Sequence, residues 1–196
     1  MRRGAEFLRE IDCFGCSLQY HLLSYIINLC SFAGNRTAGS DFVRILVLSD
    51  SHGSTGNILE AIEKHSNAEV VVFLGDGESD FENAEYFLRD KRVIGVAGNC
   101  DFRSDKPFCE ITTVGGKRIY CTHGHEERVK WGLGELISRA RAEKADIVLY
   151  GHTHTPVNTY DDGLYIFNPG SLRDGSYGVI DITPSGVMPI HMKLWK

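Results

Sequence analysis

Five short polar blocks, each following an apolar run of strand length, carry side chains that could bind metal ions. They supply two aspartates, one asparagine and four histidines: Asp50, His52, Asp76, Asn99, His123, His152 and His154. Carboxylate and amide oxygens, together with imidazole nitrogens, are the ligands that divalent cations take in proteins. Any single block is typical of an ordinary turn after a strand. Their joint occurrence, each past a strand, predicts a metal centre.

This ligand set fits the hydrolysis of a phosphate ester by two divalent ions. In such sites the ions lie ~3.5–4 Å apart and share a bridging carboxylate and a water. The ions lower the pKa of the water, so that a metal-bound hydroxide becomes the nucleophile, and they neutralise the charge that develops on the phosphoryl oxygens. The order of the blocks, with Asp-x-His first and His-x-His last, differs from that of amidohydrolase-type barrels and metallo-β-lactamase-type sites.

Three apolar runs with helical patterns between them must position the first four ligands. Continuous apolar strands that alternate with helices indicate a parallel sheet covered on both faces. Asp50, Asp76 and Asn99 are 26 and 23 residues apart, which is about one strand–helix unit each. We therefore expect these side chains to meet at the carboxyl ends of the strands, where open α/β sheets bind ligands. The expected strands are 43–48, 70–74 and 92–97, and the expected helices are 57–65 and 79–89. One face of the second helix is expected to carry Phe81, Ala84, Phe87 and Leu88.

After Asn99 the pattern changes to hairpins. Two glycines join strands 108–114 and 117–122, and Asp162-Gly163 joins strands 157–160 and 164–167. A helix over 126–142 and a short strand over 147–150 are expected between these hairpins, and strands 177–182 and 188–194 are expected to complete a meander. A second, mixed sheet follows from this pattern. The expected fold class is α/β, a four-layer αββα sandwich of two mixed sheets flanked by helices.

Composition restricts the class of protein. The chain has 196 residues, 42% of them hydrophobic and 24% charged, which fits one domain with a sizeable core. Its net charge of -5 gives no overall basic field that would attract duplex nucleic acid. Six cysteines without a clean secretory signal indicate reduced thiols and a cytoplasmic protein. Cys13-x-x-Cys16 leaves a redox role or half of a zinc site open.

Residues 1–42 differ in character from the rest and are interpreted as an N-terminal extension. Their apolar stretch from Leu22 to Phe32 is too short to span a bilayer. The first convincing strand begins at Val43, so one hypothesis places the true start of the protein near that residue. An amphipathic helix that touches a membrane or a partner is the alternative. The domain proper is expected to span 43–196.

The five blocks resemble those of the calcineurin-like metallophosphoesterase superfamily. The short length and the form Gly98-Asn99-Cys100-Asp101 are most similar to its small bacterial and archaeal YfcE-like phosphodiesterase branch, and the resemblance runs from Val43 to near the C-terminus. It implies two divalent metal ions, most often Mn²⁺, with Ni²⁺, Fe²⁺ or Zn²⁺ as alternatives. By position, Asp50, His52, Asp76 and His154 would hold one ion, and Asp76, Asn99, His123 and His152 the other.

The resemblance also implies the residues on the substrate side of the centre. Asn99, Cys100, Asp101 and His123 are the expected catalytic residues, and Asn99, Cys100, His125 and Arg173 are the expected substrate contacts. Cys100 departs from the wider superfamily, which usually has a histidine there that contacts the substrate phosphate and can protonate the leaving group. A thiol can donate a proton but carries no positive charge. We therefore expect slow turnover or a preference for good leaving groups.

The sequence supports three functions from different classes to different extents. The first is a phosphodiesterase that acts on a small phosphodiester or phosphomonoester. The second is a binding module without catalysis, like the small subunit of the retromer coat, and the seven filled ligand positions argue against it. The third is a repair-type nuclease, which the 17 basic and 22 acidic residues of 43–196 disfavour. No membrane span is expected, and the meander's edge strands leave a homo-oligomer open.

Overall fold

A computed structural model of the protein describes residues 42–195. The described residues form one compact unit. The expectations for the N-terminal extension, including the amphipathic helix and the Cys13-x-x-Cys16 motif, lie outside the described residues. The boundary near Val43 remains a prediction.

The first sheet contains the strands that lead to Asp50, Asp76 and Asn99. Its strand order is β10-β9-β1-β2-β3, and β1, β2 and β3 run parallel while β9 is antiparallel to both β1 and β10. Leu48 pairs with Phe73, which in turn pairs with Gly95, so the three parallel strands end side by side. The strands are β1 (Val43–Leu48), β2 (Val70–Phe73), β3 (Arg92–Gly95), β9 (Ser176–Thr183) and β10 (Gly186–Lys193).

The second sheet contains the strands that lead to the histidines. Its order is β4-β5-β6-β8-β7, in which β5, β6 and β8 run parallel and the two edge strands run antiparallel to their neighbours. Cys121 pairs with Leu149, which pairs with Phe167, so these strands also end together. The strands are β4 (Cys109–Val114), β5 (Lys117–Thr122), β6 (Ile147–Leu149), β7 (Val157–Asp161) and β8 (Leu164–Asn168).

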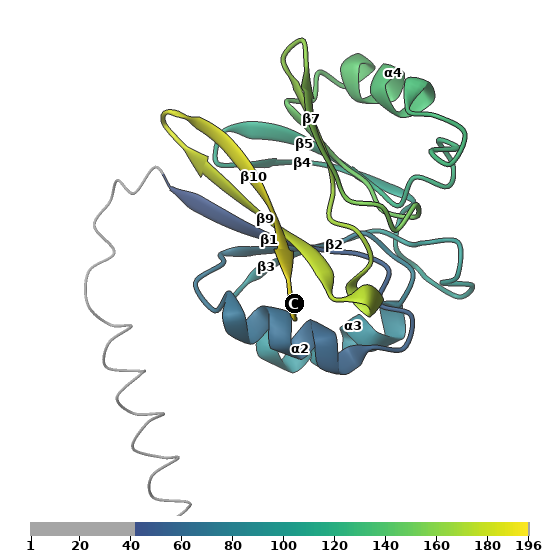
Figure 1. The fold of residues 1–196 in the computed structure, drawn as a ribbon, viewed down its shortest axis with the longest axis vertical. Helices are drawn as coiled ribbons and strands as arrows, with labels where there is room; N and C mark the ends of the chain where they lie inside the picture. The colour runs from purple at the N-terminus through teal and green to yellow at the C-terminus, as the bar shows by residue number, and fades with distance from the viewer. Residues whose placement is uncertain (1–41, 196) are drawn as a thin grey trace, which may run out of the picture. The chain divides into compact units, whose positions relative to one another are not determined.

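Helices cover the outer faces of the two sheets, which confirms the predicted four layers (Figure 1). The helices are α2 (Thr55–Lys64), α3 (Glu78–Ala84) and α4 (Gly134–Ala142), with 3₁₀ turns η1 (Glu85–Leu88) and η2 (Leu172–Asp174). Ile58 of α2 and Phe81 of α3 pack in the same core as Phe73 of β2, whereas Leu136 of α4 packs with Val148 of β6. A third core, between the sheets, contains residues of both.

Two helical predictions are corrected by the structure. The helix expected over 126–142 begins only at Gly134, and turns precede it. Arg128 and Gly132 have φ values of 54° and 145°, which an α-helix cannot contain. Phe87, expected on a buried face, is 54% exposed, because the α-helix ends at Ala84 and the 3₁₀ turn changes the period of the side chains.

The position of the C-terminal hairpin is also corrected. Strands β9 and β10 were expected in the second sheet, but they extend the first sheet beside β1. The physical reason is that β9 is apolar on both faces: Val179 packs in the core under α2 and α3, while Ile180 and Ile182 pack between the sheets. Such a strand is stable only where both faces are covered, and the place beside β1 provides this cover.

Candidate metal centre

All seven predicted ligands lie in turns at the carboxyl ends of strands from the two sheets. Asp50 and His52 follow β1, Asp76 follows β2, Asn99 follows β3, His123 follows β5, and His152 and His154 follow β6. Backbone hydrogen bonds tie these turns together. Asp50 N donates to Gly75 O at 3.0 Å within the first sheet, and Gly151 N donates to His123 O at 3.1 Å within the second.

Glycines beside the ligands allow the turns to approach one another. A Cβ atom at Gly98 would lie 2.1 Å from Oδ1 of Asp76, and one at Gly151 would lie 2.0 Å from Oγ of Ser49. Neither glycine has a positive φ, so close packing, rather than backbone conformation, requires glycine there. The glycines in the Gly-Asn and Gly-His motifs therefore permit the ligand-bearing turns to touch.

Five of the seven ligand residues adopt the left-handed backbone conformation, which non-glycine residues rarely adopt. A left-handed conformation costs an L-residue ~1–2 kcal/mol. Strain of this kind persists where surrounding structure enforces it, and it clusters at functional sites. The φ values are 56° for Asp50, 42° for His52, 59° for Asp76, 66° for His152 and 57° for His154.

The first ligand group comprises Asp50, His52 and His154, whose ligand atoms all lie within 4.8 Å of one another. The Nε2 atoms of the two histidines are 3.2 Å apart. Oδ1 of Asp50 lies 3.1 Å from Nε2 of His154 and 3.8 Å from Nε2 of His52. Asp50 is fully buried, and within the described residues its Oδ1 makes no hydrogen bond. A buried carboxylate oxygen that makes no hydrogen bond and faces two imidazole nitrogens fits a metal ligand.

The second group comprises Asp76, His123 and His152, which also lie within 4.8 Å of one another. Nδ1 of the buried His123 donates to the carbonyl oxygen of Leu74 at 2.7 Å, so in the neutral ring the lone pair is on Nε2. That Nε2 lies 3.1 Å from Nδ1 of His152 and 3.2 Å from Oδ1 of Asn99. Acceptor atoms from three side chains therefore converge on one point.

Asp76 lies between the two groups. Its Oδ1 accepts a hydrogen bond from the backbone N–H of Cys100 at 2.7 Å, which fixes the carboxylate plane. Its Oδ2 lies 3.5 Å from Nε2 of His123 and 3.8 Å from Nε2 of His52. One carboxylate oxygen thus faces both groups of ligands.

The ionisable groups of the centre shift one another's pKa values. Burial raises the pKa of Asp50 and lowers the pKa of His152 to about 4, the latter with help from the neighbouring His123 charge. Burial alone would also lower the pKa of His123, but the adjacent Asp76 and Asp50 outweigh it and raise that pKa. Burial likewise opposes ionisation of Asp76, yet the contact with His123 lowers its pKa. The buried carboxylates and imidazoles of the centre therefore interact strongly with one another.

The side chain of Asp101 holds the turn of a ligand in place. Asp101 accepts hydrogen bonds from four backbone N–H groups, those of Asp76, Gly77, Glu78 and Gly98, at 2.8–3.0 Å. Burial raises the pKa of its carboxyl group, but these four bonds outweigh burial and lower the pKa. The structure thus places Asp101, expected among the catalytic residues, against the backbone of the turn that carries Asp76.

Sequence reasoning missed Asp80, which it assigned only to the start of a helix. The carboxylate of Asp80 accepts hydrogen bonds from Ser51 Oγ and Gly53 N, both at 2.7 Å, and so fixes the turn around His52. The amide of Asn168 donates to Gly151 O at 2.9 Å and supports the turn between His152 and His154. Single polar residues at element ends have no spacing pattern that would reveal them.

The expected substrate contacts differ in how close their side chains lie to the ligand groups. Cys100 is exposed, with its ligand atom within 4.8 Å of those of His52 and Asp76. The ring of His125 lies 5.4 Å from that of His123, and Phe108 covers it edge-on at 5.2 Å. Arg173 is exposed, and its backbone N–H donates to Asp50 O at 3.1 Å. The structure records no contact of the Arg173 side chain with the ligand groups.

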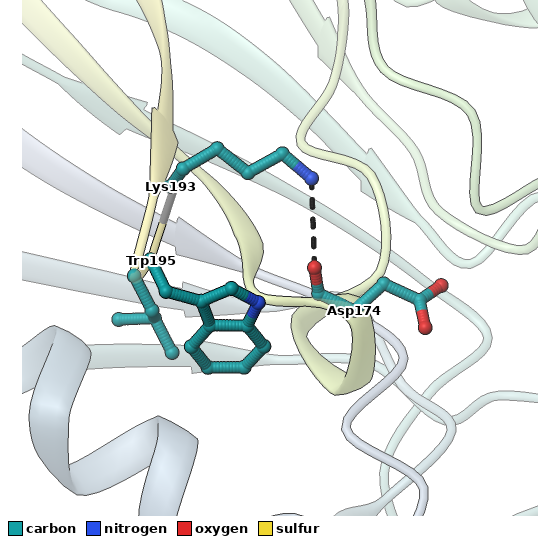
Figure 2. A pocket seen from close by; sticks show the side chains of 4 residues that line it. Asp174, Lys193 and Trp195 are labelled. Atoms are coloured by element: carbon teal, nitrogen blue, oxygen red, sulfur yellow. Dashed lines mark hydrogen bonds between the residues drawn. The ribbon is translucent and has the colours of Figure 1, made fainter.

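A separate hollow lies near the C-terminus (Figure 2). Asp174, Lys193, Leu194 and Trp195 line it, and Nζ of Lys193 donates to the Asp174 carbonyl oxygen at 3.5 Å. None of the seven ligands contributes to this hollow. Its lining has no group of metal ligands, so it does not compete with the centre as a site of metal chemistry.

Comparison with known proteins shows the family of the chain. Residues 43–183 match the calcineurin-like phosphoesterase superfamily domain. The chain belongs to this superfamily. The probable metallophosphoesterase YsnB of Bacillus subtilis is 35% identical over 131 residues, covering 67% of this chain and 76% of YsnB. The phosphodiesterase YfcE of Escherichia coli is 29% identical over 169 residues, covering 71% and 88% of the two chains.

The fold is shared with solved members of this phosphoesterase group. A predicted phosphoesterase from Streptococcus pneumoniae superposes with a TM-score of 0.63 at 24% identity, covering 77% of this chain and 98% of that one. The protein is therefore a metal-dependent phosphoesterase with the expected αββα architecture. Among residues 42–195, no helix is long and apolar enough to cross a membrane.

Proposed function

We propose that this phosphoesterase is a phosphodiesterase with a binuclear metal centre. One ion would be held by Asp50, His52 and His154, the other by Asn99, His123 and His152, and Asp76 would bridge them. The observation that carries the proposal is the carboxylate oxygen of Asp76, which lies 3.8 Å from His52 and 3.5 Å from His123. It faces two separate groups of ligands, as a bridging carboxylate must.

The donor set suits two hard or borderline divalent ions. Three carboxylate or amide side chains and four imidazoles favour Mn²⁺, Fe²⁺, Ni²⁺ or Zn²⁺. We propose Mn²⁺ as the resident metal, on the resemblance to the superfamily. When bound, the two ions would supply Lewis acidity and a hydroxide nucleophile for attack on phosphorus.

The chain's own residues would orient the substrate around this centre. Asn99 is exposed and its Oδ1 lies 3.2 Å from Nε2 of His123, so we propose that its amide N–H donates to a phosphoryl oxygen. We propose that Cys100 and His125 contact the ester and that Arg173 provides a cation for a further phosphate oxygen. Burial and the neighbouring Asp76 raise the pKa of Cys100 to about 11. The Cys100 side chain carries no positive charge that would assist the leaving group, so esters with good leaving groups should be preferred.

Small esters fit this site better than duplex nucleic acid. Residues 43–196 contain 17 basic and 22 acidic residues, so the domain has no excess of positive charge to track a phosphate backbone. The relatives named as phosphodiesterases support a diester as the preferred class. We propose a small phosphodiester in the cytoplasm as the substrate.

The test is hydrolysis of bis-p-nitrophenyl phosphate by metal-stripped protein to which Mn²⁺ is returned, with p-nitrophenyl phosphate as the monoester comparison. We expect Mn²⁺-dependent turnover that favours the diester. Loss of a residue that hydrogen-bonds to a metal ligand typically lowers metal affinity or activity ~10–100-fold. Asp76→Ala and His154→Ala remove the ligands themselves, so their turnover should fall by more than that.

Asp162→Ala is the matched control. Asp162 is an exposed carboxylate in the turn between β7 and β8, and it pairs with Arg141 of α4. It should retain full turnover. The proposal fails if folded wild-type protein shows no turnover with Mn²⁺, Ni²⁺, Fe²⁺ or Zn²⁺. It also fails if Asp76→Ala retains the wild-type rate.

A further inference from the structure

Cys100 belongs to a third group of potential metal ligands that overlaps both others. The sulfur of Cys100, a ring nitrogen of His52 and a carboxylate oxygen of Asp76 all lie within 4.8 Å of one another. A thiol, an imidazole and a carboxylate at such separations can share one ion. Neither the superfamily pattern nor the seven-ligand set includes this sulfur.

Two contacts hold the cysteine against the centre. Its backbone N–H donates to Oδ1 of Asp76 at 2.7 Å, which fixes the residue beside the proposed bridging carboxylate. The Asn99 amide nitrogen donates to Sγ at 3.2 Å. An amide donor stabilises a sulfur that bears negative charge, as a metal-bound thiolate does.

A second observation favours a cation on this side of the centre. Oδ1 of Asp50 is buried and makes no hydrogen bond within the described part of the chain, and it lies 3.1 Å from Nε2 of His154 and 3.8 Å from Nε2 of His52. His52 thus belongs both to the group of this oxygen and to the Cys100 group. A cation beside His52 would compensate Asp50 and would be within reach of the sulfur.

We propose that the Cys100 thiolate is an additional ligand of the metal ion held by His52 and Asp76. On coordination the S–H bond breaks, its proton passes to solvent, and a sulfur–metal bond forms without any change of oxidation state. The proposal rests on the binuclear centre proposed above. Because thiolate is a soft ligand, it favours Zn²⁺ and Co²⁺ over Mg²⁺ at this position.

The other cysteines of the described domain cannot take this role. Cys121 is fully buried in the core between the sheets, and Cys109 packs half-buried against the core under α4. Neither belongs to a potential metal-ligand group within residues 42–195. Cys109 is therefore a suitable control for Cys100.

The test is electronic absorption of full-length, metal-stripped protein loaded with Co²⁺. A cysteine ligand gives a sulfur-to-cobalt charge-transfer band in the near ultraviolet, whereas d–d bands in the visible report the bound ion itself. We expect both in the wild-type protein. Cys100→Ser should lose the charge-transfer band and keep the d–d bands. Cys109→Ser and the double variant Cys13→Ser/Cys16→Ser should keep both.

The outcomes separate this proposal from the one on which it rests. Visible d–d bands without charge transfer in the wild-type protein would leave the metal centre standing and overturn the role of Cys100. Charge transfer that persists in Cys100→Ser would also overturn it. The absence of d–d bands altogether would reject the centre and this proposal together. A second readout is alkylation of Cys100 by iodoacetamide, which Zn²⁺ should block in the wild-type protein but not in His52→Ala.

Discussion

At the scale of single residues, the proposed centre depends on buried side chains whose acceptor atoms face one another. Nε2 of His123 faces Asp76, Asn99 and His152 with its lone pair, and Oδ1 of Asp50 is buried without a hydrogen bond in the described range. The left-handed backbone at Asp76 is maintained by neighbours such as Asp101, which accepts a hydrogen bond from Asp76 N, rather than by local preference. A variant that loosens such a neighbour should weaken metal binding without touching a ligand.

Asp101→Asn tests this role. Asparagine keeps the shape of the side chain but replaces one acceptor oxygen with an NH₂ donor, so it cannot accept all four backbone N–H groups. We expect the Kd for Mn²⁺ to rise ~10–100-fold, as for other residues that orient metal ligands. The measurement is isothermal titration calorimetry with metal-stripped protein.

Asp105→Asn, at an exposed carboxylate on the same loop, is the matched control and should bind Mn²⁺ like the wild-type protein. A wild-type Kd in Asp101→Asn would show that the four hydrogen bonds do not position Asp76.

At the scale of elements, sequence patterns predicted the strands well where local burial determines them. The apolar runs before Asp50 and Asp76 became β1 and β2, and the Gly115-Gly116 turn joined β4 to β5. The late start of α4 was missed because residues 126–130 are rich in good helix formers, although Arg128 among them adopts a left-handed conformation. The sheet that receives β9 was missed because strand pairing depends on contacts distant in sequence.

The contact between α2 and β9 gives a pH-dependent prediction. His65 ends α2, and its Nε2 lies 3.0 Å from the hydroxyl of Tyr177 in β9. Burial, with nearby Arg44, lowers the pKa of His65 below its ordinary value of 6.5. As the pH falls below 6.5, the unfolded chain therefore binds the proton first, and the free energy of unfolding decreases.

The Tm of metal-stripped protein should accordingly fall as the pH is lowered through this range, and His65→Gln should show a smaller slope of Tm against pH. Glu63→Gln, an exposed position on the same helix, is the control and should follow the wild-type slope across the histidine range. Equal slopes for the wild-type protein and His65→Gln would contradict the lowered pKa.

At the scale of the whole molecule, the proposed centre joins the two sheets. The first sheet supplies Asp50, His52, Asp76 and Asn99, and the second supplies His123, His152 and His154, so each proposed ion takes ligands from both sheets. The ligand blocks predicted which strand ends would meet. They did not predict how the two sheets stack, because the core between the sheets depends on side chains from segments distant in the sequence.

Metal binding should therefore stabilise the entire domain. A ligand at ~100 times its Kd raises the free energy of unfolding by about 2.7 kcal/mol when it binds only the folded state. We expect Mn²⁺ to raise the Tm of the wild-type protein and to raise that of His123→Ala, which loses a ligand of one of the two ions, by less, measured by calorimetry. Bound Mn²⁺ without any rise in Tm would contradict ligation across the sheets.

The most direct test of the central claim is electron paramagnetic resonance of the Mn²⁺-loaded protein together with its metal stoichiometry. A bridging Asp76 predicts two ions per chain and an exchange-coupled dimanganese signal. Asp76→Ala should lose that signal, while Asp162→Ala should keep it. Two bound ions that give only the signal of isolated Mn²⁺, or a coupled signal that survives in Asp76→Ala, would contradict the binuclear centre.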